Sequence, residues 1–115
     1  MFISSTYDRF KFVDLVHAIT GWDTSLLELE KVGERVYSMA RAFNAREGFN
    51  RKDDYLPKKI YKQLLGKGPT AGTSWKEEDL ERAKDTYYAL AGWDVKTGNP
   101  TQAKLKELGL DWIAL

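Results

Sequence analysis

One run of apolar residues constrains the fold of this 115-residue chain more than any other feature. Apolar side chains recur at steps of three or four residues, at Leu26, Leu29, Val32, Val36, Met39 and Phe43. This spacing predicts a helix, because every third or fourth residue of an α-helix lies on the same face. Ser25 and Glu28 have the spacing of a capping box, which predicts the start. Gly48 predicts an end near Arg46, since glycine readily takes the left-handed conformation that closes a helix.

Four further helices are predicted from similar signals, whereas the alternation typical of β-strands is hard to find. Ser74 and Glu77 make a second capping-box pattern, ahead of a helix that should end at Gly92. Three shorter helices are predicted from Phe12 to Gly21, from Pro57 to about Leu65, and from Gln102 to Leu108 after a Thr101 cap. The expected buried face of the Pro57 helix comprises Tyr55, Leu56, Ile60 and Leu64. The chain is therefore expected to be all-α, a single domain over residues 1–115 with about five helices in an irregular bundle.

Two Gly-Trp-Asp motifs follow predicted helix ends, at Gly21-Trp22-Asp23 and Gly92-Trp93-Asp94. In each motif the glycine is expected to stop the helix, and the tryptophan is expected to fold back onto the apolar side of that helix. The aspartate is expected to begin the next turn.

Charge and cysteine content exclude several classes of protein. Eighteen Lys and Arg nearly balance 17 Asp and Glu, so the formal charge of +1 gives no overall attraction to nucleic acid or to an anionic membrane. No stretch approaches the roughly 18 apolar residues of a membrane span, and no signal peptide is recognisable. The absence of cysteine rules out disulfides and fits a reducing compartment. We therefore expect a cytoplasmic protein with no membrane partner.

The side chains offer little for catalysis. One histidine and no cysteine cannot build a closed zinc site, and His17 is expected to be a surface residue of a short helix. The Gly-rich stretch GKGPTAGTS lacks the order of residues of a phosphate-binding loop. Glu77, Glu78 and Asp79 are consecutive on a helix and therefore point in different directions. No catalytic, cofactor-binding or metal-binding residue is expected in this chain.

A basic patch with tyrosines nearby is the main candidate for binding. Six Lys or Arg and only two Asp lie between Phe49 and Lys67, with Tyr55 and Tyr61 among them. Bases interleaved with aromatic rings can bind single-stranded nucleic acid. Against that interpretation, the apolar and aromatic residues of this segment are expected to form the buried face of the Pro57 helix, and a run of charged residues is usually a solvated surface. The patch from Arg51 to Lys67 leaves open a stand-alone helical module that binds a protein or, less favoured, a nucleic acid.

An ordered series of motifs resembles a known family. The segment GERVYSMARAFNAREGFNRKDDYLP, Gly33 to Pro57, resembles the C-terminal segment of the aldehyde ferredoxin oxidoreductases, which are tungsten-pterin enzymes. That family has a similar Gly-Glu-Arg, then Phe-Asn-x-Arg-Glu-Gly-Phe, then Asp-Asp-x-Leu-Pro. The motifs YYALAGWD and GNPTQAKLKELGL follow in the family's order. The resemblance spans about Phe12 to Leu110, and its specificity lies in the ordered set.

The resemblance implies that the chain is a C-terminal structural or substrate-channel portion of an enzyme that oxidises aldehydes to carboxylic acids. In that family electrons pass through a [4Fe-4S] cluster to ferredoxin, and the cluster and a tungsten or molybdenum bis-pterin are bound by residues upstream of this region. No cofactor or activity is therefore expected in this chain alone. The resemblance also implies a fragment that begins just after the last cluster cysteine, or alternatively a separately encoded or truncated paralogue.

The resemblance gives the charged segment around Arg51 two interpretations. In the first it is a structural joint, in which Arg46 and Gly48 end the long helix, Asp53 or Asp54 caps the next one, and Arg51 neutralises those acids. In the second, Arg46, Arg51, Asp53 and Asp54 form an interdomain docking surface for upstream domains. Residues 1–10 are expected to pack on the same missing domains, and without them to favour self-association.

Overall fold

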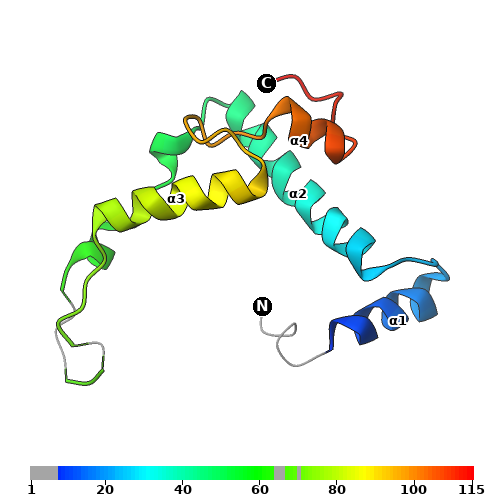
Figure 1. The fold of residues 1–115 in the computed structure, drawn as a ribbon, viewed down its shortest axis with the longest axis horizontal. Coiled ribbons are helices and arrows are strands. Elements are labelled where there is room, and N and C mark those ends of the chain that lie inside the picture. Colours follow the sequence, from blue (N-terminus) through cyan, green and yellow to red (C-terminus); the bar gives the residue numbers. More distant parts are fainter. Residues whose placement is uncertain (1–7, 64–66, 70) are drawn as a thin grey trace. The chain divides into compact units, whose positions relative to one another are not determined.

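The computed structural model describes residues 8–63, 67–69 and 71–115 (Figure 1). The described part contains the α-helices α1 (Arg9–Thr20), α2 (Leu26–Arg46), α3 (Glu77–Ala91) and α4 (Gln102–Glu107), and the short 3-10 helices η2 (Arg51–Asp53) and η3 (Lys58–Tyr61). Its only β-pairing is an isolated antiparallel bridge between Trp93 and Pro100. The predicted all-α class is confirmed, and the described residues contain four α-helices where about five helices were predicted. The chain divides into two compact units, residues 1–39 and 40–115.

The first unit holds α1 and the beginning of α2. Asp8 caps α1 by accepting a hydrogen bond from the backbone N–H of Phe10 at 3.0 Å, and Gly21 ends the helix in the left-handed conformation. Arg9 of α1 pairs with Glu30 of α2 at 3.4 Å. Residues 1–7, which carry most of the expected N-terminal docking segment, lie outside the described residues. None of the α1 side chains is buried, and Ile19 is 74% exposed.

The start of α2 confirms the predicted capping box. The backbone N–H of Glu28 donates to Ser25 Oγ at 3.2 Å, and the backbone N–H of Ser25 donates to Glu28 Oε2 at 2.9 Å. These bonds satisfy two donors that the first turn of a helix cannot satisfy itself. The helix ends at Arg46 as predicted, and Gly48 follows with a φ of 90°.

The second capping box is not formed, so that prediction is wrong. α3 begins at Glu77, its N-cap is Lys76, and no side chain caps it. Ser74 therefore lies two residues before the N-cap position and cannot reach the first-turn N–H groups. The acids Glu77, Glu78 and Asp79 instead occupy the first turn, where the helix dipole favours negative charge.

The two serines make a matched pair for testing the contribution of the cap. We expect Ser25→Ala to lower helix stability by about 1 kcal/mol, the usual cost of losing an N-cap side chain. Ser74→Ala should have almost no effect, because its hydroxyl caps nothing. Thermal denaturation followed by far-UV circular dichroism measures both. Equal shifts in the two variants would contradict the assignment of Ser25 as the cap.

The predicted helix from Pro57 to Leu65 is also wrong in the described part. η3 covers only Lys58–Tyr61, with a 2.9 Å hydrogen bond from the Ile60 N–H to the Pro57 carbonyl, and Lys62 returns to an extended conformation. Tyr55 is 76% exposed, so it is not part of a buried face; Leu56 and Ile60 are half-buried, and Leu64 lies outside the described residues. One short turn cannot recover the entropy cost of helix nucleation, and the glycine-rich loop that follows cannot extend it.

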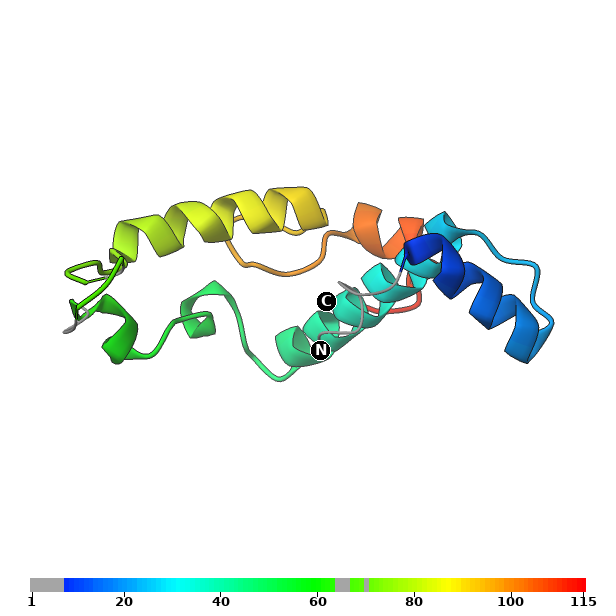
Figure 2. The same cartoon turned by 90° about the horizontal axis from the view of Figure 1, so that it is seen from below.

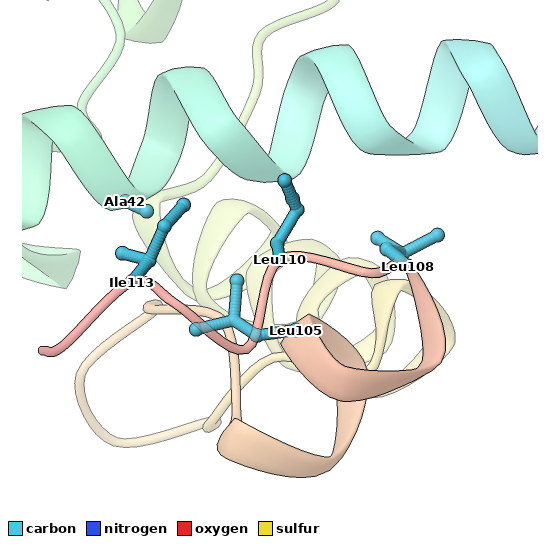
Figure 3. Close-up of a cluster of buried hydrophobic side chains, with 5 residues drawn as sticks. All are labelled: Ala42, Leu105, Leu108, Leu110 and Ile113. Atoms are coloured by element: carbon cyan, nitrogen blue, oxygen red, sulfur yellow. The ribbon is translucent and has the colours of Figure 1, made fainter.

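The second unit contains the hydrophobic core. Figure 3 shows its five buried side chains gathered where α4 and the C-terminal segment meet the end of α2, namely Ala42, Leu105, Leu108, Leu110 and Ile113. Thr101 caps α4 as predicted, by accepting from the N–H of Lys104 at 3.2 Å. The apolar residues that recur along one face of α2, from Leu26 to Phe43, lie mostly outside this core. Val36 and Phe43, for example, are 55% and 62% exposed.

Candidate functional site

The charged segment that follows α2 lies alongside α3, and both belong to the second unit (Figure 2). Polar contacts connect this segment to the end of α2, to α3, and to the loop from Gly92 to Pro100. They form two neighbouring groups of side chains. One group is centred on Asp54 and the other on Arg51.

Asp54 accepts a two-pronged ion pair from Arg41 of α2. Arg41 Nη1 donates to Asp54 Oδ1 at 2.8 Å and Nη2 donates to Oδ2 at 2.7 Å, while Nε donates to the Gly98 carbonyl at 2.8 Å. The Tyr88 hydroxyl donates to Asp54 Oδ2 at 2.5 Å. Only 10% of the Arg41 side chain is exposed. Partial burial alone would raise the pKa of Asp54, but the hydrogen bonds from Arg41 and Tyr88 outweigh it and leave that pKa lowered.

Arg51 faces α3 rather than its neighbours in sequence. Its guanidinium pairs with Glu81 at 2.5 Å and with Asp85, and donates to the Val95 carbonyl at 2.8 Å. The hydrogen bonds to Glu81 and Asp85 raise the pKa of Arg51. Lys84 pairs with Glu81 at 2.6 Å and also donates to the Asp54 carbonyl at 3.0 Å. Hydrogen bonds from Lys84 and then Arg51 lower the pKa of Glu81.

An aromatic layer covers the two arginines. Tyr88 stacks on Trp93 with ring centroids 6.2 Å apart, Arg41 lies 5.7 Å from the Trp93 centroid, and Arg51 lies 5.6 Å from that of Tyr88. Trp93 thus folds back on α3 as predicted. The same prediction is wrong for Trp22, which is 67% exposed. His17 is exposed as predicted, with Nδ1 2.9 Å from the Trp22 carbonyl oxygen.

Gly98 is required where the loop crosses Arg41 and Tyr88. Its φ is 71°, and a Cβ at this position would come within 2.8 Å of Arg41 Nη2 and 2.9 Å of Tyr88 Cζ. Both are well below normal contact distance, and both side chains are held by Asp54. Any larger residue would therefore strain the backbone and displace the ion pair.

The structural joint predicted around Arg51 is confirmed only at the end of α2, at Arg46 and Gly48, and its two other predicted contacts are wrong. Asn50 caps η2, with Asp53 accepting from the Asn50 N–H at 2.9 Å, and Pro57 stands at the N-cap of η3, so neither aspartate caps the next helix. Arg51 neutralises Glu81 and Asp85 rather than Asp53 and Asp54. Arg46 is exposed at the end of α2. The docking role of Arg46, Arg51, Asp53 and Asp54 stays a prediction.

Sequence reasoning missed the residues that hold the joint together. Arg41, Lys84, Tyr88 and Gly98 gave no local signal for the contacts that join separate segments, because the partners in those contacts lie from 10 to 57 positions away in the chain. Arg41 lies on α2 among residues that looked solvent-facing. Tyr88 could have been noticed as an aromatic residue beside the Gly92-Trp93 helix stop.

Titration of Tyr88 provides a pH test of this network. Burial and then the hydrogen bond to Asp54 raise the pKa of Tyr88 to about 12, from the ordinary tyrosine value of 10.0. The folded protein therefore keeps a proton that the unfolded chain releases, so the stability due to Tyr88 is complete below about pH 10 and is lost as the pH rises toward 12. We expect Tyr88→Phe to flatten the fall in unfolding free energy over that range. Denaturant titrations at several pH values measure it.

Tyr55→Phe is the control for this titration. The Tyr55 side chain is 76% exposed, and its hydroxyl donates to no carboxylate in the described part of the chain. Its pH dependence should follow that of the unaltered protein. If the curves for Tyr88→Phe and the unaltered protein run parallel between pH 10 and 12, the hydroxyl of Tyr88 is not coupled to Asp54.

A cleft of about 650 Å³ opens beside the joint, between the segment carrying η2 and η3 and the start of α3. Its cationic side chains are Arg51, Lys52, Lys58, Lys84 and Lys96, and its acids are Asp54, Glu77 and Glu81. Tyr55, Leu56, Tyr61 and Leu80 supply apolar surface. The cleft contains part of the predicted basic patch, whereas Lys59 and Lys62 lie outside it.

The described residues of the segment around Arg51 are joined to α2 and α3 by ion pairs and hydrogen bonds. They contain no group of three or more His, Asp or Glu side chains placed to hold a metal ion. No helix in the part of the chain that the structure describes is long and apolar enough to cross a membrane. The acids and bases at the centre of the joint neutralise one another.

Comparison with known proteins assigns the chain to a family. The model of the family described as "Aldehyde ferredoxin oxidoreductase, domains 2 & 3" matches residues 1–110. The tungsten-containing aldehyde ferredoxin oxidoreductase of Pyrococcus horikoshii is 36% identical over 101 residues, which are 87% of this chain and 16% of the relative. The enzyme of the same name from Pyrococcus furiosus is 35% identical over 98 residues, 84% of this chain and 16% of the relative.

A solved structure has a similar fold. The chain is similar to part of the active site complex BamBC of benzoyl coenzyme A reductase in complex with 1,5-dienoyl-CoA, with a TM-score of 0.73 and 27% identity. The similarity covers 93% of this chain and 14% of that one. The chain thus spans about a sixth of the length of the proteins it matches. The ordered motifs, the helical fold and the match over residues 1–110 together establish that this chain belongs to the aldehyde ferredoxin oxidoreductase family.

Proposed function

We propose that this chain is the C-terminal helical portion of an enzyme that oxidises aldehydes to carboxylic acids. In that reaction the carbonyl carbon gains an oxygen from water, and two protons and two electrons are released. The electrons would pass through a [4Fe-4S] cluster to ferredoxin. The observation that supports this proposal is the family match over residues 1–110, together with relatives that are tungsten-containing aldehyde ferredoxin oxidoreductases.

The residues present do not fit the cofactors of such an enzyme. The chain has no cysteine, so it offers no thiolate to an iron-sulfur cluster, and its described residues form no group of metal ligands. We therefore assign the tungsten or molybdenum bis-pterin and the cluster to the remainder of a longer protein. No catalytic step is assigned to the residues of this chain. The protein is proposed to act in the cytoplasm.

The role proposed for this portion is structural, and it includes lining part of the substrate channel. Large apolar side chains stand exposed on all three longer helices, including Leu15, Ile19, Val36, Phe43 and Leu90. Apolar surface of this extent is normally covered by neighbouring protein. We propose that upstream domains of the same protein cover it, with residues 1–10 and the charged set Arg46, Arg51, Asp53 and Asp54 at the contact. The 115-residue chain alone is then expected to self-associate.

The natural protein that carries this sequence provides the test. An antibody raised against the 115-residue chain would purify it from its source cells for mass, metal and activity measurements. We expect a polypeptide roughly six times longer, by comparison with the 16% coverage of its relatives, with bound tungsten or molybdenum and iron and with aldehyde-dependent reduction of a viologen dye. A metal-free protein of 115 residues would contradict the proposal and favour the binding module built on Arg51 to Lys67.

A further inference from the structure

The cleft beside the joint carries an excess of positive charge that no contact within the described structure explains. Five cationic and three acidic side chains line it. Two of these acids form ion pairs. Asp54 pairs with Arg41, and Glu81 pairs with Arg51 and Lys84. Glu77 is the one lining acid without an ion pair in the described residues. The internal pairs therefore neutralise most of the negative charge in the cleft.

Three lysines account for the excess. Lys52 comes from η2, Lys58 from η3 and Lys96 from the loop after α3. All three are exposed and make no ion pair within residues 8–63, 67–69 and 71–115, although Lys96 lies near enough to Asp94 for its charge to help lower the pKa of that aspartate. Leu56 and Leu80 also line the cleft and are half-buried, while the Tyr55 ring is 76% exposed. We refer to the three exposed lysines as the rim of the cleft and to the two half-buried leucines as its floor. Its volume of about 650 Å³ is large enough for several side chains of a partner.

We propose that this cleft binds an acidic segment of a separate protein, with carboxylates facing Lys52, Lys58 and Lys96 and an apolar side chain on the floor formed by Leu56 and Leu80. Opposite charges across an interface set its orientation and speed the encounter of the two proteins. The inference does not depend on the oxidoreductase assignment, because it uses only the charges and shape of the cleft.

The docking set proposed for the upstream domains shares only Arg51 and Asp54 with the cleft, and both are held by ion pairs within this chain. The chemistry of the three exposed lysines favours a separate, reversibly bound protein over a permanent covering by the same chain. Permanent interfaces are mainly apolar, and burying three strongly hydrated lysines without tight partners is costly. A small anion would need donors held rigidly toward it, whereas lysine ammonium groups are flexible point charges. A nucleic acid carries a charge on every phosphate, and Glu77, Glu78 and Asp79 at the start of α3 would repel it. A polypeptide can place a neutral residue opposite those acids.

The test uses the 115-residue chain and a short, fluorescently labelled peptide of Glu and Gly with one central Leu. Fluorescence anisotropy should show saturable binding that weakens as salt is added. The variant Lys52→Gln/Lys58→Gln/Lys96→Gln should bind roughly tenfold more weakly or worse. The control variant Arg9→Gln/Lys11→Gln/Lys106→Gln loses the same charge from exposed basic side chains outside the cleft and should bind within about twofold of the unaltered chain. Circular dichroism confirms that each variant is folded.

Several outcomes would overturn the proposal. No binding at physiological salt, or equal weakening in the two triple variants, would show that the cleft is not a site for acidic segments. Stronger binding by a single-stranded oligonucleotide or by inorganic triphosphate would replace the acidic protein with a nucleic acid or a small anion. In the longer natural protein, protection of Lys52, Lys58 and Lys96 from an amine-modifying reagent would show that the same chain covers the cleft.

Discussion

Replacing Asp54 with alanine is expected to lower the free energy of unfolding of the second unit by about 3 kcal/mol. The substitution leaves the Arg41 guanidinium, which is 10% exposed, without a carboxylate, and it removes the acceptor of the Tyr88 hydroxyl. Breaking a buried ion pair costs roughly 3–5 kcal/mol, and the lower end applies because the Asp54 side chain is 33% exposed. Denaturant unfolding followed by tryptophan fluorescence, with Trp93 in contact with the network, measures the loss.

Two further variants separate the ion pair from a general effect of losing an acid. Asp111→Ala removes an exposed carboxylate and should leave the unfolding free energy nearly unchanged. In the Asp54→Ala background, Arg41→Met removes the unpaired charge while keeping an apolar side chain of similar reach, so part of the lost stability should return. If the double variant is less stable than Asp54→Ala by the full cost of Arg41→Met alone, the two side chains are not coupled.

Acid should weaken the same contact in the unaltered protein. The pKa of Asp54 is lowered in the folded state, so the unfolded chain takes up a proton there at a higher pH than the folded protein does. The stability from Asp54 is therefore present above the ordinary pKa of an aspartate, about 3.9, and is lost as the pH falls below it. In Asp54→Ala this part of the acid dependence should disappear.

Replacing Leu105 with alanine is expected to cost about 3 kcal/mol or more. Leu105 is fully buried at the centre of the five-residue core, and removing such a side chain loses its burial energy and leaves a cavity. Because that core is small, the loss should expose α4 and the C-terminal segment together. Loss of the near-UV circular dichroism signal at a lower denaturant concentration measures the effect.

The other leucines of the C-terminal segment provide the comparison. Leu115→Ala removes the same atoms from a side chain that is 48% exposed and should cost less than about 1 kcal/mol. A Leu105→Ala variant no less stable than Leu115→Ala would mean that the cluster in Figure 3 does not hold α4 in place.

The resemblance read from the ordered motifs between Gly33 and Leu110 was enough to identify the family. The family match over residues 1–110 confirms the resemblance. Motifs can identify a family in this way because their residues and their order can be read directly from the sequence. The same motifs could not reveal the cleft. Lys96 is separated from Lys52 by more than the length of α3, and only the packing of the loop against η2 brings them to one rim.

What the sequence determined by itself is the set of local features whose causes lie within one turn of the chain. The Ser25–Glu28 cap, the stops at Gly21, Gly48 and Gly92, and the Thr101 cap all involve bonds across a few residues, and all are present. The tertiary structure decided which charges pair and which apolar residues are buried. Arg51 had acids beside it in sequence, yet it pairs with Glu81, 30 positions away, because α3 holds that carboxylate within reach. Leu105 is buried, whereas most of the apolar residues along α2 from Leu26 to Phe43 are not. Burial depends on which segments pack together rather than on the spacing of apolar residues.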